Sequence, residues 1–202
     1  MNEQPPVRIG VVGTYATGKT TLMRRIEMEV RAVGIPALRV GGLAKRAAEL
    51  GLPKMTNHTA LSTEWLITAG IADELAATTH ARAILADCAA PAALAYYTAA
   101  LEHRGELTPV TTLDRLRALV TAASTPYDLL IATVLDPREP LPDPRDEAQS
   151  EPHHRDPAFR QLVDSHTHKL LSELNLGHVL VANDDTSRSD ALRLAMTMAG
   201  VA

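Results

Sequence analysis

The fold of this chain is decided by residues 7–20, which read VRIGVVGTYATGKT. The first six residues are rich in β-branched side chains and predict a short buried strand. Beyond the loop, apolar and charged residues recur at helical spacing over residues 20–33, and Gly34 and Pro36 end the pattern. We therefore expect a strand, a glycine-rich loop and a helix in direct succession.

The loop at residues 13–20 matches the pattern G-x-x-x-x-G-K-T. Its glycines let the backbone curl so that successive N–H groups face phosphate oxygens, and the helix N-terminus adds partial positive charge. Lys19 would reach the β- and γ-phosphates, and Thr20 would give an oxygen to Mg²⁺. A glycine turn that only lets strand and helix pack is the alternative, but it gives no reason for the lysine. The expected contacts to a nucleoside triphosphate come from Gly13, Thr14, Tyr15, Ala16, Thr17, Gly18, Lys19, Thr20 and Thr21.

The rest of the chain predicts an α/β fold with a parallel sheet. Short apolar stretches at residues 37–40, 82–87, 127–135 and 177–182 predict four more strands, and helical patterns separate them. Continuously apolar strands of this kind are typical of a sheet covered by helices on both faces, which makes three layers. The expected helices cover residues 43–50, 59–79, 91–103, 113–123, 158–174 and 187–199.

The composition fits a single domain over residues 1–202, with 46% apolar residues and a net charge of −4. The acidic balance and the few aromatic residues disfavour a nucleic-acid partner, since such binding relies on basic surfaces and stacking rings. No apolar stretch is long enough to span a membrane, and we see no leader before the first strand. The single cysteine, Cys88, cannot form an internal disulfide, and we expect it to be a small buried side chain. A cytoplasmic protein is therefore expected.

One segment departs from the regular pattern, at about residues 136–157. It contains six prolines among charged residues, so long helices or strands cannot form there. We expect a mobile surface segment, for which a flexible connector is the simplest interpretation.

Asp87 stands at the end of the third expected strand, where a carboxylate is costly unless a cation lies beside it. A Mg²⁺ ion held by Thr20 would be that cation, which makes Thr20 and Asp87 the expected metal-binding pair. The alternative is that Asp87 only caps the following helix.

With these motifs in place, the chain resembles the P-loop small-molecule kinases. More narrowly, it is similar to the nucleoside and nicotinamide-riboside kinase-like ATP-binding proteins. The matching stretches are residues 13–20, 40–46, 85–96, 127–130 and 156–160. The resemblance implies a P-loop fold with a five-stranded parallel sheet, and it makes the proline-rich segment a lid that closes over ATP.

The resemblance also assigns roles to residues outside the loop. Asn183 and Asp184 fall where the family places a loop near adenine, although Asp185 or Thr186 could simply cap the last helix. Arg155 and Arg160 would bring positive charge to the phosphates when the lid closes, and Arg138 and Arg145 are weaker candidates. A surface charge is the plain alternative for each of these arginines.

The side that would hold the acceptor departs from the family pattern. Gly41 and Gly42 stand where the family has an acid. Where the family follows its aspartate with an arginine, this chain follows Asp87 with Cys88. The acid expected one turn later is replaced by an apolar stretch that includes Ala92. Either the acceptor is unusual or transfer to a small molecule has been lost.

An acceptor base is therefore sought on the helix at residues 59–79. Glu64 is the first candidate because it adjoins Trp65, which could wall a pocket, although a lone Trp is more often part of the core. Asp73 and Glu74 are the other acids of this helix.

Histidine pairs at residues 153–154 and at His166 and His168 do not indicate zinc, because no cysteine lies near and alternate helix positions face different ways. The leading hypothesis is a Mg²⁺- and ATP-dependent kinase of a small hydroxylated molecule, such as a nucleoside. The alternative is a nucleotide-binding regulatory protein with weak ATP hydrolysis. A nucleic-acid-binding ATPase is disfavoured by charge. The alanine-rich residues 89–100 could pack inside the fold or against a second subunit, so a homodimer stays open.

Overall fold

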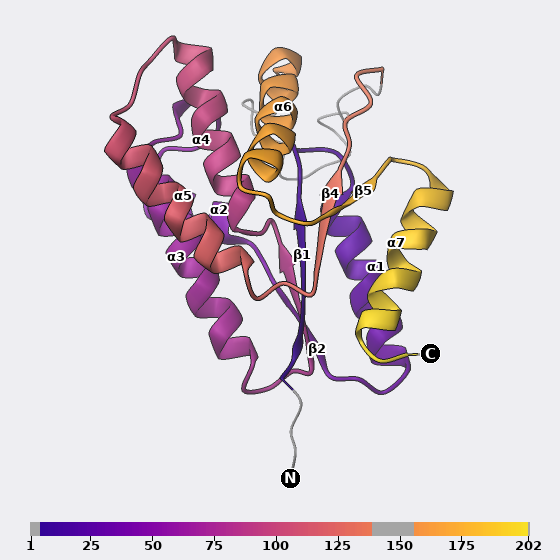
Figure 1. Ribbon diagram of the computed structural model, residues 1–202. Helices are drawn as coiled ribbons and strands as arrows, with labels where there is room; N and C mark the ends of the chain where they lie inside the picture. Colours follow the sequence, from indigo (N-terminus) through magenta and orange to yellow (C-terminus); the bar gives the residue numbers. More distant parts are fainter. Residues whose placement is uncertain (1–4, 139–155, 202) are drawn as a thin grey trace.

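The core of the protein is a five-stranded parallel sheet (Figure 1). The structure, a computed structural model, describes residues 5–138 and 156–201. The strands lie in the order β2-β3-β1-β4-β5, which confirms the expected α/β class and strand number. Their bounds are β1 Val7–Val12, β2 Ala37–Val40, β3 Ala83–Asp87, β4 Leu129–Thr133 and β5 Val179–Val181.

The central strand β1 brings the predicted loop and the predicted carboxylate to one edge of the sheet. Val11 of β1 is level with Asp87 of β3 on one side and with Ile131 of β4 on the other. All strands run in the same direction, so their carboxyl ends meet at this edge, where ligands bind in open α/β sheets.

One face of the sheet is covered by α1 Lys19–Ala32 and α7 Asp185–Met198, which pack on each other. The inner stripe of α1 consists of Leu22, Met23, Ile26 and Val30. Met28, which the apolar pattern placed with them, is 71% exposed, because it lies half a turn from that stripe.

The other face carries a larger group of helices, among which α4 and α6 run side by side (Figure 1). Their apolar side chains form clusters around the fully buried Leu94, Leu116 and Phe159. The elements on this side are α2 Leu43–Glu49, the short 3-10 helix η1 Met55–Asn57, α3 Ala60–Ala77, α4 Ala90–Arg104, α5 Val110–Ser124 and α6 Pro157–Glu173.

Several boundaries differ from the sequence prediction. The fourth strand begins at Leu129 instead of residue 127, because the Asp128 carboxylate accepts a hydrogen bond from the Arg8 backbone before the ladder starts. Helix α5 begins at Val110, directly after Pro109. The last helix is capped by Asp184, whose side chain accepts from the Ser187 backbone at 2.8 Å, so the cap predicted at residues 185 or 186 is wrong.

Most of the expected lid, residues 139–155, lies outside the described residues, and so do Arg145, Arg155 and the histidine pair at 153–154. Within the two described ranges, none of the helices has both the length and the apolar composition that crossing a membrane requires.

Candidate functional site

The loop between β1 and α1 has the geometry of an anion-binding loop. Gly13 and Gly18 have φ angles of +138° and +76°, which favour glycine. A Cβ atom on Gly13 would lie 2.0 Å from the Thr133 hydroxyl, so no larger residue fits there. Gly18 precedes α1, whose first turn has neither a side-chain cap nor an acidic residue. The first N–H groups of α1 are thus available to phosphate oxygens, as the sequence pattern requires.

Lys19 folds back over this loop and donates to the carbonyl oxygen of Thr14. Burial lowers the pKa of Lys19, while the nearby Cys88 and Asp87 act in the opposite direction. A lysine whose ammonium is poorly solvated gains most from an anionic ligand, because the ligand replaces the missing water.

Two buried threonines link the phosphate loop to strand β4. The hydroxyls of Thr17 and Thr133 lie 2.7 Å apart, and Thr17 also donates to the Thr14 carbonyl at 2.9 Å. Thr133 ends β4, so it links the loop to the neighbouring strand. Its part in the site was missed in the sequence, where it is one of many threonines.

The start of α6 clamps the same loop. The Tyr15 hydroxyl donates to the Asp156 carbonyl at 2.5 Å, and burial with the nearby Asp156 raises the pKa of Tyr15 to about 12. Arg160 is 3% exposed and donates to the carbonyls of Tyr15 and Ala16 at 3.1 and 2.9 Å. The guanidinium expected to reach phosphates from a lid is therefore engaged with the loop backbone.

Thr20 and Asp87, the expected metal-binding pair, lie side by side. The Thr20 hydroxyl is 3.3 Å from one Asp87 oxygen, and Arg39 of β2 donates to the other at 3.0 Å. Arg39 was missed in the sequence analysis, although its position at the end of a strand next to β3 could have suggested it. A Cβ atom on Gly41 would lie 3.1 Å from that of Asp87, so glycine at this position leaves room for the carboxylate.

The loop between β5 and α7 reaches the other side of Gly18. Asn183 accepts a hydrogen bond from Arg188, and a Cβ atom on Gly18 would lie 2.1 Å from the Arg188 guanidinium. Asp184 and Asn183 are exposed, and Asp184 serves as the cap of α7. The structure thus brings these predicted adenine-side residues close to the phosphate loop.

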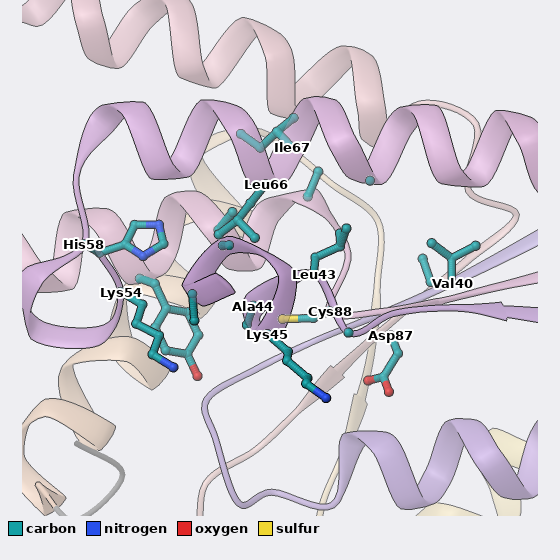
Figure 2. A pocket seen from close by; sticks show the side chains of 18 of the residues that line it. Val40, Leu43, Ala44, Lys45, Lys54, His58, Leu66, Ile67, Asp87 and Cys88 are labelled. Atoms are coloured by element: carbon teal, nitrogen blue, oxygen red, sulfur yellow. The ribbon is translucent and has the colours of Figure 1, made fainter. Parts of the chain in front are cut away.

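A cavity of about 1200 Å³ opens beside the loop (Figure 2). Lys19, Thr20 and Asp87 lie at one end, and the walls come from α2, α3, α4 and residues 53–58. Most of the lining is apolar, including Val40, Leu43, Ala44, Ala47, Leu66, Ile67, Gly70, Ile71, Ala90 and Ala93.

Away from the phosphate loop and the end of β3, six polar side chains interrupt this apolar lining. Glu74 was only a secondary candidate, and the other five were not expected there: Lys45, Glu49, Lys54, His58 and Tyr96. Glu74 is 6% exposed and accepts a hydrogen bond from the Tyr127 hydroxyl at 2.7 Å. Burial raises the pKa of Glu74 and outweighs this hydrogen bond.

Cys88 also lines the cavity, and the expectation that it is buried is wrong. Its φ angle of +76° turns the chain sharply after β3 and directs the side chain to the cavity. Ala92, by contrast, is fully buried, while Ala90 and Ala93 line the cavity. An acid at position 92 would therefore point into the core.

Glu64 does not contact the cavity, and its expected place there is wrong. It forms an ion pair with Arg115 of α5 on the outer side of α3. Trp65 is half-buried beneath Arg46, whose guanidinium lies 5.7 Å from the ring centre, so it neither walls the cavity nor belongs to the core. The remaining acid of this helix, Asp73, pairs with the same Arg46.

The histidines of α6 have separate partners. His166 lies 2.8 Å from Glu102, and His168 lies 3.7 Å from Asp164. In the described part of the chain, no three His, Cys, Asp or Glu residues are grouped so that they could hold a metal ion.

Comparisons with known proteins agree with this geometry. A solved structure of NadR with NAD and AMP-PNP superposes with a TM-score of 0.67 at 18% identity, over 98% of this chain. Deoxyadenosine kinase from M. mycoides with bound dATP gives 0.66 at 11% identity, over 95% of this chain and 99% of that one. The chain has the P-loop kinase fold. The expected resemblance is thus confirmed at the level of structure.

At identities this low, the comparisons show that the chain has the P-loop kinase fold and show nothing about its activity. The chain spans about half the length of the NadR chains that it matches. No protein-family model matches the sequence, and no curated protein does.

Proposed function

We propose that this protein transfers the γ-phosphoryl group of ATP to a hydroxyl of a small molecule bound in the cavity. The observation that carries the proposal is the position of the cavity, which ends at Lys19, Thr20 and Asp87 beside the phosphate loop. A second substrate in this space would lie next to the terminal phosphate. Relatives in structure point the same way, since one is a deoxyadenosine kinase.

In this reaction the acceptor oxygen forms a bond to the γ-phosphorus while the bond from that phosphorus to the ADP oxygen breaks. Such transfer needs alignment and positive charge more than a strong base. The loop N–H groups would hold the phosphates, and Lys19 would leave the Thr14 carbonyl to meet them. The proton of the acceptor hydroxyl would pass to an oxygen of the transferred phosphoryl group, because both Asp87 oxygens are engaged, one by Arg39 and one on the side of Thr20.

Thr20 and Asp87 would hold Mg²⁺, because a hydroxyl and a carboxylate are ligands that this ion prefers. The ion neutralises phosphate charge when it is bound. Arg39 fixes one Asp87 oxygen at 3.0 Å and leaves the other directed at Thr20. Asn183 and Asp184 would flank adenine, and Arg155 stays a predicted source of further charge.

The first experiment measures transfer from γ-labelled ATP with Mg²⁺ to a panel of nucleosides and small alcohols. A no-acceptor sample reports hydrolysis alone. Lys19→Ala should reduce labelling at least about 100-fold, since it removes a cation from the transferred group. Lys169→Ala, an exposed lysine on α6, is the matched control and should leave the rate unchanged.

The outcome separates the two hypotheses. A labelled acceptor that disappears in Lys19→Ala supports the kinase. ATP binding with slow hydrolysis and no labelled acceptor would contradict it and favour a nucleotide-binding regulatory protein, in which the altered Gly42 and Cys88 reflect lost transfer.

A further inference from the structure

The far wall of the cavity contains a histidine nitrogen without a hydrogen-bond partner. His58 is 3% exposed and lines the cavity (Figure 2). Its Nε2 atom is buried and has no partner among the described residues. Leaving a buried polar atom unpaired costs about 1–3 kcal/mol, so a histidine with a purely structural role would normally have a partner.

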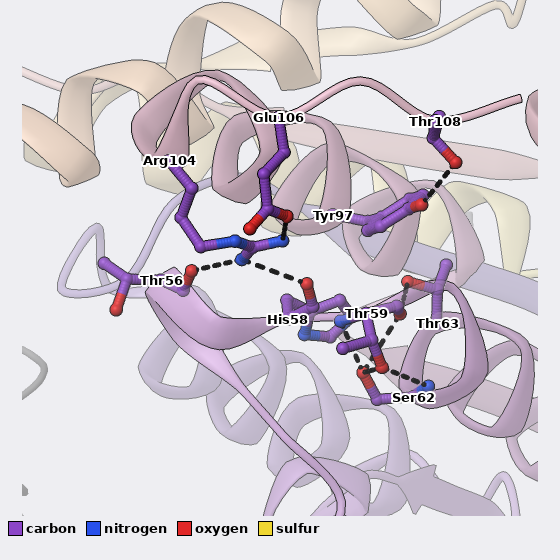
Figure 3. A network of polar contacts seen from close by, with 9 residues as sticks. All are labelled: Thr56, His58, Thr59, Ser62, Thr63, Tyr97, Arg104, Glu106 and Thr108. Carbon is purple, nitrogen blue, oxygen red and sulfur yellow. Dashed lines mark hydrogen bonds and ion pairs between the residues drawn. The ribbon is translucent and has the colours of Figure 1, made fainter.

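The backbone around His58 is held in place from outside the cavity. Arg104 of α4 donates to the carbonyls of Thr56 and His58, the latter at 3.3 Å, and Glu106 accepts from Arg104 at 2.7 Å (Figure 3). The wall is therefore tied to α4 by charged hydrogen bonds, which makes it a fixed surface and not a loose loop.

Local backbone features fix the same segment. Thr59 and Ser62 form a reciprocal capping box that starts α3 directly after His58. Met55 has a φ angle of +55°, an unfavourable conformation for a residue with a side chain. Strain of this kind persists only where the surroundings impose it, and it is concentrated at binding sites.

Charge around the imidazole favours one class of ligand. Burial, and secondarily the nearby Arg104, lower the pKa of His58 to about 4, so the ring is uncharged near neutral pH. Arg104 donates to the His58 carbonyl and Lys54 lines the same end of the cavity, and both are cationic. A positively charged group would be repelled here, and an oxygen with lone pairs would be attracted.

The ring also has an aromatic neighbour. The centres of the His58 and Tyr96 rings are 6.5 Å apart, and Tyr96 lines the cavity as well. A flat or apolar body could pack between these walls while its polar end meets the imidazole.

We propose that His58 recognises the far end of the acceptor, by donating a hydrogen bond from Nε2 to an oxygen with lone pairs, such as a carbonyl, amide, hydroxyl or carboxylate oxygen. His58 is a specificity residue in this assignment and takes no part in the phosphoryl step. That the ligand is the phosphoryl acceptor rests on the proposed function, but the presence of a binding site at His58 does not.

The test uses four probes of the same shape: benzamide, benzoate, benzamidine and isopropenylbenzene. They carry an uncharged oxygen, an anion, a cation and a hydrocarbon group in turn. Each is titrated into the full-length protein with AMP-PNP and Mg²⁺, and the nitrogen signals of ¹⁵N-labelled histidine are followed by NMR. The spectrum of His58→Gln identifies the His58 signals.

Benzamide and benzoate should shift the His58 Nε2 signal in a saturable way, while benzamidine and isopropenylbenzene should leave it in place. Equal shifts with all four probes, a shift with benzamidine alone, or no shift with any probe would overturn the proposal. This measurement does not depend on phosphoryl transfer, so the proposal can hold even if the protein is not a kinase.

A second measurement uses whichever acceptor the labelling panel identifies. His58→Leu, which keeps the volume without the hydrogen bond, should raise the acceptor KM at least about 10-fold, and kcat should change much less. His58→Gln should recover most of the affinity, because its amide can donate from a similar position. Unchanged KM in a folded His58→Leu protein with normal ATP affinity would overturn the assignment and leave the kinase function intact.

Discussion

The phosphate loop and the adjoining cavity differ in how the chain builds them. The loop is eight consecutive residues, and it would meet its ligand mainly with backbone N–H groups and one lysine. The cavity is assembled from α2, α3, α4, the ends of β2 and β3 and residues 53–58, and it would meet its ligand with side chains. A site made of contiguous backbone leaves a pattern in the sequence, whereas a site made of distant side chains becomes visible only in the fold.

The strongest way to test this division is to change the residue that both regions share. Asp87→Asn should reduce phosphoryl transfer about 100- to 1000-fold, because it removes the charge that faces Thr20 and the cavity. Asp73→Asn, on α3 and away from the cavity, is the control and should keep nearly full activity. Rates in single-turnover assays distinguish the two, and equal activity of both variants would remove Asp87 from the site.

Acid should lower the free energy of unfolding through His58 in the far wall of the cavity, and not through the phosphate loop. The pKa of His58 is about 4 in the folded protein and about 6.5 when unfolded, so the unfolded state binds more protons between these values. The free energy of unfolding should therefore fall by about 3 kcal/mol as the pH drops from 6.5 to 4. Denaturant titrations at several pH values measure this loss.

His58→Gln is the comparison for that titration. Other groups contribute equally to both proteins, so the difference between them isolates His58. A wild-type protein that loses no more stability than His58→Gln would show that the imidazole is not shielded from water.

The hydrogen bonds from Arg104 of α4 to the backbone of the far wall should make a smaller contribution to stability. Arg104→Met should lower the free energy of unfolding by about 2 kcal/mol, because it leaves the carbonyls of Thr56 and His58 without a charged donor. The acceptor KM should rise while the affinity for ATP stays the same. Arg117→Met, an exposed arginine on α5, should change neither. Weaker ATP binding in Arg104→Met would contradict the separation of the two regions.

On the loop side, Gly18→Ala and Gly34→Ala form a matched pair. Both glycines have φ angles near +80°, so alanine strains both by about 1 kcal/mol. Only at Gly18 would the new Cβ also meet Arg188, and nothing lies within 4 Å of one at Gly34. Equilibrium binding of a fluorescent ATP analogue should weaken in Gly18→Ala alone. Equal affinity in the two variants would mean that Arg188 moves aside at no cost.

The smallest effect is expected at Glu64. Glu64→Gln removes an ion pair with Arg115 that lies near the surface and contributes at most about 1 kcal/mol. Transfer to the acceptor should be unchanged, because Glu64 is not in the cavity. A large loss of activity would mean that the face of α3 that carries Glu64 lines the cavity, and would contradict this placement.

The phosphate loop and the cavity also differ in how well they could be predicted from the sequence. The strands, their number and the loop could be predicted because apolar β-branched stretches and the glycine–lysine pattern are local signals. The proximity of Thr20 and Asp87 was predicted because a carboxylate at the end of a buried strand is costly without a cation beside it. The bounds of the first two strands were predicted correctly, but those of the fourth were not, since the contact between the Arg8 backbone and the Asp128 carboxylate precedes that strand.

The cavity acid shows why the acceptor side was harder to predict. Glu64 was chosen over Glu74 because it adjoins Trp65, but the two acids lie on different faces of α3. Buried residues of α3 recur as Thr63, Ile67, Gly70, Glu74 and Ala77, so helical spacing does place Glu74 on the inner stripe. His58 and Lys45 had no comparable signal, because their place depends on how α2 and residues 53–58 meet α3.

The close contact between Gly41 and Asp87 also restricts how this chain could change over time. An acid introduced at position 41 would set a second carboxylate against the first, with the two Cβ atoms 3.1 Å apart, and evolution could not easily take that step. Position 42 is different. No atom lies within 4 Å of a Cβ there, and its φ angle of +75° is one that Asp and Asn tolerate better than most residues. A single substitution at residue 42 is thus the most accessible route by which a lineage, or a protein engineer, could introduce an acid on this side.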